Sequence, residues 1–206
     1  MLRPVILFAC ALLVSPALAQ TPSPVKTAEL SARLFDAGVQ ARDPLLILAA
    51  AKLRKTLNPA ATDRAAADGT AEAGFPLGWE DMLAAAAPLA EGDDTLLGLI
   101  DDIRAETTKG VATGPVYNIG QIANGKTDTY PQVDFIGNEY AEIYVEAKGA
   151  TDLNLAVTDA QGRLVCSDTD KSHIAYCGWR PDRTAPFLIT VTNRGPNGVT
   201  YALMTN

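Results

Sequence analysis

The chain has 206 residues, of which 20% are charged, and its formal net charge is −7. Its Lys and Arg residues are mostly interleaved with acidic ones and form no basic patch. Because nucleic-acid affinity depends largely on cations that neutralise phosphates, no nucleic-acid partner is expected. Binding to anionic membrane surfaces is excluded on the same ground.

The first 19 residues are predicted to be a secretory signal peptide. Arg3 supplies the positive charge, residues 5–14 form the apolar stretch, and residues 17–19 place small side chains at the cleavage position. Cleavage is expected before Gln20, so the mature protein is expected in the periplasm or secreted. The apolar stretch is shorter than the roughly 20 residues that a bilayer requires. No later stretch is long and apolar enough, so the mature chain is expected to lack a membrane span.

Two cysteines, Cys166 and Cys177, remain after processing. In an oxidising compartment, this pair most simply forms a disulfide. The competing interpretation is a catalytic cysteine activated by His173. It is less favoured because a nucleophilic thiolate needs an activating environment and no ready disulfide partner.

Residues 20–26 are predicted to be a flexible linker, and residues 27–110 a small helical region with four amphipathic helices. Asp43-Pro44 is typical of a helix start, because Asp accepts first-turn N–H groups and Pro lacks one. Trp79 is expected to open the third helix and Asp93-Asp94 to cap the fourth. Residues 58–77 are predicted to be a loop. The second helix is expected to bury a stripe of Leu46, Ala49, Ala50, Leu53 and Leu57.

After Gly110 the apolar period changes to two, which indicates strands over residues 111–206. In residues 140–147, Tyr and Glu alternate with Ala, Ile and Val, so this strand is expected to bury one face only. The other predicted strands cover residues 153–157, 164–166, 174–177, 187–192 and 199–204. The fold class is therefore α+β: a small N-terminal helical region followed by an antiparallel, jelly-roll-like β-sandwich.

The strand region also carries a family resemblance. Residues 128–135 and 141–145 resemble the opening strands of the bacterial pre-peptidase C-terminal domain family. Residues 149–162 are similar to its central segment, and the closing strand pair through Tyr201 is similar too. The resemblance covers about residues 115–206 and none of the helical half. It implies a β-sandwich of exported proteins that binds substrates or surfaces, in some members with calcium.

Five side chains form a candidate calcium site: Asp152, Asn154, Asp159, Asp168 and Asp170. Calcium takes six to eight hard oxygen ligands, which carboxylates on adjacent loops can supply. The competing interpretation is that these are turn residues, whose side chains cap their own backbone. No EF-hand spacing is present, and Asn154 stands where the family commonly has Asp. No cofactor is expected apart from this possible calcium.

Trp179, together with Tyr176 and Tyr201, is a candidate aromatic platform for a glycan or a peptide. The favoured alternative is that Trp179 packs against the cystine and the sandwich core, because large aromatic side chains are highly buried on average.

The single histidine, His173, is expected on an exposed loop, and it excludes metal sites that need several histidines. No G-x-S-x-G nucleophile motif is present. The sequence therefore predicts a non-enzymatic binding or accessory module that engages an envelope or extracellular protein. The alternative is a calcium- or carbohydrate-binding sandwich, and a third hypothesis is an unrecognised hydrolase that uses His173.

Overall fold

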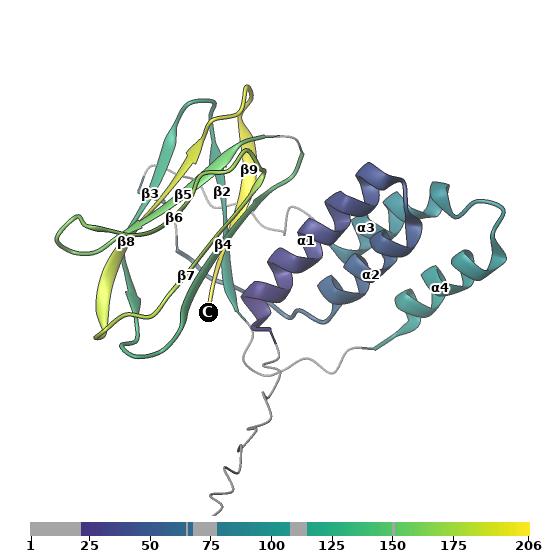
Figure 1. The fold of residues 1–206 in the computed structure, drawn as a ribbon, viewed down its shortest axis with the longest axis horizontal. Coiled ribbons are helices and arrows are strands. Elements are labelled where there is room, and N and C mark those ends of the chain that lie inside the picture. The colour runs from purple at the N-terminus through teal and green to yellow at the C-terminus, as the bar shows by residue number, and fades with distance from the viewer. Residues whose placement is uncertain (1–21, 65, 68–77, 108–114, 150) are drawn as a thin grey trace, which may run out of the picture.

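A computed structural model describes residues 22–64, 66–67, 78–107, 115–149 and 151–206. The predicted signal peptide and its cleavage site lie outside these residues, as does the predicted domain boundary near residue 110. The fold class is confirmed as α+β, with a helical unit beside a two-sheet β-sandwich (Figure 1). In the described part of the chain, no helix has the length and apolar character needed to cross a membrane.

The sandwich consists of two sheets in which every strand pair is antiparallel except β1 with β2. The predicted strands are confirmed, whereas β1 and β2 were not predicted individually. In spatial order, the first sheet contains β1 (Ala60–Ala61), β2 (Val116–Ile122), β9 (Val199–Thr205), β4 (Ala141–Ala147) and β7 (Ile174–Trp179). The second contains β3 (Thr127–Phe135), β8 (Ala185–Asn193), β5 (Leu153–Thr158) and β6 (Leu164–Asp168).

The predicted disulfide is confirmed and closes one side of the sandwich. Cys166 on β6 is bonded to Cys177 on β7, with Cα atoms 5.8 Å apart. These strands are edge strands of different sheets, so the bond joins the two layers directly. Alternating side chains fill the space between the layers, as in β5, where Leu153, Leu155 and Val157 are fully buried.

Strand β4 differs from its prediction, because both of its faces are buried rather than one. Ile143 and Val145 face the sandwich core, while Tyr144 belongs to a second cluster with Val25 and Ala28 of helix α1 (Pro24–Ala41). The helical unit therefore covers the outer face of the first sheet. The alternation of Tyr and Glu with apolar residues had indicated that the face with Tyr144 and Glu146 is exposed to solvent.

The other helices are α2 (Pro44–Lys55), α3 (Trp79–Ala86) and α4 (Asp94–Ala105). The predicted caps are confirmed: Asp43 accepts the N–H of Leu45 at 2.9 Å, and Asp93 caps α4 in the same way. Helix α1 starts earlier than predicted, because Ser23-Pro24 is itself a cap followed by a first-turn proline. The predicted linker over 20–26 is thus wrong for residues 24–26.

The buried stripe of α2 is shifted from its prediction, although Ala50 is buried as expected. Leu53 is exposed instead, and the fully or nearly fully buried residues are Ile47, Leu48, Ala50, Ala51 and Arg54. Helices α1 and α2 approach closely at Gly38, where a Cβ atom would lie 2.7 Å from Ile47 Cγ1. The predicted stripe contained apolar residues only, whereas the buried face of α2 includes the charged Arg54.

Part of the predicted loop over 58–77 returns to the sandwich between α2 and α3. Ala60 and Ala61 pair with β2 as strand β1, and the N–H of Ala67 donates to Thr129 at 2.9 Å. Ala66 packs into the sandwich core. The chain thus runs from helices to sandwich, back to helices, and again to the sandwich.

Candidate functional site

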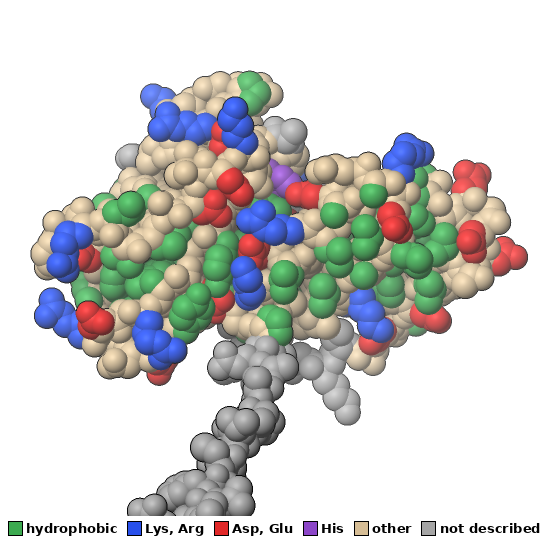
Figure 2. Space-filling model, in the orientation of Figure 1, with side chains coloured by type: hydrophobic (Ala, Val, Ile, Leu, Met, Phe, Trp, Pro, Cys, Tyr) green, Lys and Arg blue, Asp and Glu red, His purple; other side chains and the backbone are tan. Residues whose placement is uncertain are grey.

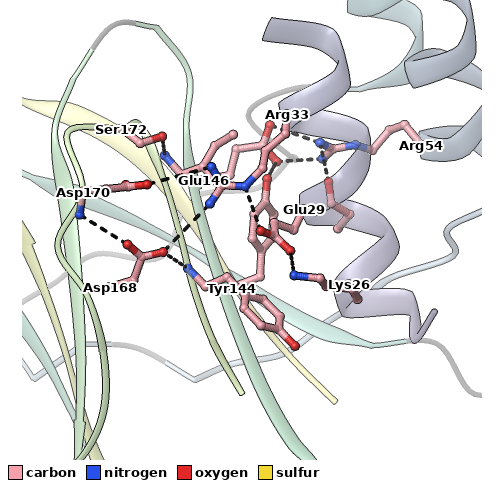
Figure 3. A network of polar contacts seen from close by, with 12 residues as sticks. Lys26, Glu29, Arg33, Arg54, Tyr144, Glu146, Asp168, Asp170 and Ser172 are labelled. Atoms are coloured by element: carbon pink, nitrogen blue, oxygen red, sulfur yellow. Dashed lines mark hydrogen bonds and ion pairs between the residues drawn. The ribbon is translucent and has the colours of Figure 1, made fainter. Parts of the chain in front are cut away.

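A buried ion pair joins the helical unit to the sandwich (Figure 3). Nη1 and Nη2 of Arg54 on α2 donate to the two carboxylate oxygens of Glu146 on β4, at 2.8 and 3.2 Å. The side chains are 4% and 0% exposed. Tyr144 donates its hydroxyl to Glu146 at 2.7 Å, and Arg54 Nε donates to Ser31 at 3.1 Å. Such a two-point contact fixes orientation as well as distance.

The local charges show how closely this pair is coupled. Burial would by itself lower the pKa of Arg54, but Glu146 and Tyr144 together outweigh it, so the pKa is raised. Burial and the same carboxylate raise the pKa of Tyr144 well above its usual value. Arg54 and Tyr144 therefore both keep their protons at physiological pH.

Further charged residues, nearer to the surface than the Arg54–Glu146 pair, also connect α1 with the sandwich. Glu29 on α1 contacts both Lys26 and Arg33, and Arg33 lies 4.0 Å from Asp168 and from Asp170 of the sandwich. Lys26 also lies over the Tyr176 ring, 4.1 Å from its centroid. These contacts dock α1 against the sheet and hold the two units in one arrangement.

A pocket of about 530 Å³ opens beside this junction, between α1, α3 and the sandwich. His173 lies in it with Nε2 3.6 Å from Asp36 Oδ1, so the prediction of an exposed loop histidine is wrong. Burial raises the pKa of Asp36, and neighbouring Glu146 adds to the rise, while His173 and Arg33 oppose it. An imidazole beside a carboxylate can transfer protons. The described lining of the pocket also contains Asp81 and Lys148 but no Ser, Thr or Cys.

A groove of about 450 Å³ runs between α2 and α4 on the outer side of the helical unit. Its walls are apolar, with Leu45 and Leu48 from α2 and Leu99 and Ile103 from α4. Leu45 is 56% exposed although it belongs to a helix whose other side is fully buried. Figure 2 shows hydrophobic side chains gathered over this part of the molecule.

The predicted calcium ligands do not come together. Asp152 precedes β5 and Asp159 follows it, so about 20 Å of extended strand separates them. Asp159 caps its own turn: its carboxylate accepts the N–H groups of Gln161 and Arg163 and pairs with the Arg163 side chain. The expectation of one five-ligand site is therefore wrong.

The remaining predicted ligands lie nearer to one another, at the start of β5 and the end of β6. Asp168 already accepts the N–H of Tyr176 at 2.9 Å. Oδ1 of Asp152 and Oδ1 of Asn154 are buried without a hydrogen-bond partner among the described residues. Within that part of the chain, no group of three or more His, Cys, Asp or Glu could hold a metal ion.

The predicted aromatic platform does not form either. Trp179 packs edge-on against Phe135 and Phe187, with ring centroids 4.8 and 5.3 Å away, and Tyr201 is fully buried in the core. Tyr176 lies on the opposite face of β7, against α1. The favoured alternative is confirmed in so far as Trp179 packs against the sandwich core.

No protein-family model and no curated protein matches the chain. Among solved structures, it is similar to the pre-peptidase C-terminal domain of a collagenase from Bacillus anthracis, with a TM-score of 0.39 and 12% identity over 45% of this chain and 89% of that one. A periplasmic inhibitor of g-type lysozyme from Aeromonas hydrophila has a TM-score of 0.33 and 14% identity over 50% and 91%.

A CBM6 from a Zobellia galactanivorans laminarinase has a TM-score of 0.29 and 10% identity over 43% and 80%. The first of the three structures is a domain of the kind that residues 115–206 resemble in sequence, and the match is weak. Likenesses this distant establish neither family membership nor function.

Proposed function

We propose that the mature chain is an exported, non-enzymatic binding module whose helical unit engages an envelope or extracellular protein. The observation that carries this proposal is helix α2, whose outward side is largely apolar and yet exposed, with Lys52 as its charged residue. Leu45 and Leu53 remain exposed opposite the buried Ile47 and Ala51. An apolar helix face is normally packed against another element.

The surface near this helix extends the argument. The exposed large hydrophobic residues of the helical unit are distributed evenly, with two each on α1, α2 and α4: Leu30, Val39, Leu45, Leu53, Leu97 and Leu99. Of these, Leu45 and Leu99 line the same groove, and an exposed apolar patch favours a protein interface.

The charges at the groove indicate what kind of segment fits it. Asp102 of α4 and Glu106, which directly follows α4, line it, and Lys52 of α2 is the single cation among the described residues of its lining. Lys52 already pairs with Glu106 at 3.5 Å, which leaves Asp102 to meet a partner. The proposed occupant is a protein segment with apolar side chains flanked by Lys or Arg.

Affinity capture tests this proposal. The full chain carries a C-terminal tag in its own envelope and is compared with Leu45→Glu/Leu99→Glu and with Leu164→Glu. Leu164 is a matched control because it is 64% exposed but lies on β6, outside the groove. One near-stoichiometric protein should be captured by the wild type and the control, and lost with the double variant. Equal capture by all three would refute the helical face as the binding surface.

Export is tested separately, because it depends on residues outside the described part of the chain. The N-terminus of protein recovered from the envelope fraction should begin at Gln20, as determined by mass spectrometry. A chain that retains Met1 and stays with the cytoplasmic fraction would contradict this part of the proposal.

A calcium-dependent sandwich is not proposed as a second function, because the five expected ligands do not meet.

A further inference from the structure

A second pocket, of about 380 Å³, lies where the β5–β6 turn meets the β7–β8 loop. Both segments are on the side of the sandwich away from the helices (Figure 1). The turn contributes Asp159 and Arg163, and the loop contributes Arg180, Asp182 and Arg183. This pocket is therefore separate from the helical groove, and an inference about it goes beyond the proposed protein interface.

The charge of this pocket is opposite to that of the chain. Three arginines and two aspartates line it, which leaves one net positive charge in a protein of net charge −7. Asp159 is occupied by its own turn, because its carboxylate accepts two backbone N–H groups and the Arg163 Nε–H. These contacts lower the pKa of Asp159, the backbone N–H of Arg163 contributing most.

The contacts of the arginines leave most of their N–H groups uncommitted. Asp159 accepts from Nε of Arg163 at 2.7 Å, and Gln161 Oε1 lies 3.5 Å from its Nη2, so Nη1 has no acceptor among the described residues. Arg180 uses one N–H for the carbonyl of Asn138. Arg183 makes no hydrogen bond or ion pair with other described residues and is exposed.

The side of the pocket formed by Trp179 is held in place by packing and by the disulfide. Trp179 lines the pocket and is packed between the rings of Phe135 and Phe187. The Cys166–Cys177 bond joins the two strands that lead into it. The indole Nε1–H of Trp179 is buried and has no acceptor among the described residues. The pocket is thus rich in donors on a rigid support, which reduces the ordering cost of binding.

We propose that this pocket binds a small organic carboxylate, the size of one amino acid or one sugar acid. The planar guanidinium presents paired N–H groups that match the two oxygens of a carboxylate. The volume lies within the range of small-molecule sites, roughly 300–1,000 Å³. Neutral molecules of the same size would leave the arginines without a charged partner, so they are expected to bind much more weakly.

Fluorescence titration of Trp179 tests this proposal in the full mature chain. Trp79, the other tryptophan, is replaced in a Trp79→Phe background so that the signal comes from the pocket. The probes are sodium galacturonate, glutamate and citrate, each at constant ionic strength, with galactose, glutamine and glycerol as neutral counterparts. At least one carboxylate should give a saturable response that its neutral counterpart lacks.

Variants locate the response. Arg163→Gln and Arg183→Gln should each weaken binding by about tenfold or more, because each removes a charge-assisted hydrogen bond. Arg183→Gln disturbs no internal contact, so it keeps the test valid if Arg163→Gln alters the turn. Arg194→Gln, an exposed arginine outside the pocket, should leave the affinity unchanged.

The proposal would be overturned if none of the three carboxylates gave a saturable response, or if the neutral probes gave equal responses. It would also be overturned if the affinity of Arg163→Gln and that of Arg183→Gln both equalled the wild-type affinity. The Leu45→Glu/Leu99→Glu variant should titrate like wild type, so failure of the helical interface and failure of this pocket are distinguishable.

Discussion

The sandwich and the helical unit are built from cores of different quality. In the main sandwich cluster, four of nineteen buried residues are alanine, whereas in the helical cluster four of ten are. Because burial stabilises in proportion to apolar area, the helical core gains less per residue. The sandwich also has a disulfide between its layers. The sandwich is therefore expected to be the more stable scaffold, and the helical unit to depend more on the contacts that dock it there.

The docking surface combines an apolar cluster, which includes Val25, Ala28 and Tyr144, with a buried ion pair. The outer face of β4 presents Glu142, Tyr144 and Glu146 to the helices, and Arg54 reaches into it from α2. A buried ion pair adds little stability relative to an apolar contact, but losing one partner is costly. The junction therefore selects one arrangement rather than supplying most of the stability.

Breaking the junction should have the largest effect. Arg54→Ala leaves Glu146 buried and unpaired, so we expect a loss of about 3–5 kcal/mol in the free energy of unfolding. Urea unfolding measures the loss, and hydrogen exchange should show α1 and α2 loosening more than β5 and β8. Arg104→Ala, which breaks an exposed pair with Asp101, should cost less than about 1 kcal/mol. Equal losses in the two variants would mean that the junction does not hold the units together.

Removing the disulfide should act on the other region. Cys166→Ala/Cys177→Ala is expected to destabilise the protein by roughly 3 kcal/mol, since the closed loop is short and the bond joins the two sheets. Exchange should rise first in β6 and β7 and leave α2 and α4 unaffected. If the helices exchanged first instead, the view of the sandwich as an independent scaffold would be wrong.

Weakening one helix cap should have a smaller effect, confined to the helical unit. Asp43→Ala removes the acceptor for the N–H groups of Leu45 and Leu46, at an expected cost of about 1 kcal/mol. Asp43→Asn keeps a good cap and should be nearly neutral. Thermal unfolding followed by circular dichroism distinguishes them, and indistinguishable melting of the two variants would show that the cap contributes nothing.

The smallest effect should come from Asp36, whose pKa is raised in the folded state mainly by burial. Its neutral form is favoured on folding, so its ionisation lowers stability. This cost is absent below the unfolded pKa, near 3.9, and complete above the folded pKa. Asp36→Asn should raise the melting temperature at pH 7 by at most about 2 °C and have no effect at pH 3. A larger gain at pH 3 than at pH 7 would reverse this sign.

Local signals in the sequence predicted much of the fold. Asp43 and Asp93 are caps whose chemistry depends only on neighbouring residues, and the strand alternation was equally local. Ser23-Pro24 carried the same kind of signal, and interpreting it as a linker missed it. Residues 176 and 179 differ by an odd number, so their parity already placed Tyr176 and Trp179 on opposite faces of one strand.

What the sequence could not show depends on contacts between distant residues. Arg54 and Glu146 are 92 positions apart, so neither the buried arginine nor the covered face of β4 had a local signal. The approach of His173 to Asp36 is of the same kind. The leucines of α2 on both sides of the helix, such as Leu45 and Leu48, were visible in the sequence and could have indicated a second contact surface.

Site-specific photo-crosslinking in the native envelope tests the central claim most directly. A photoreactive amino acid is placed at position 45 in the helical groove and, in a second variant, at position 164 on the sandwich. The account predicts a single crosslinked protein from position 45 and none from position 164. The same adduct from both positions, or an adduct from position 164 alone, would contradict the helical unit as the binding surface.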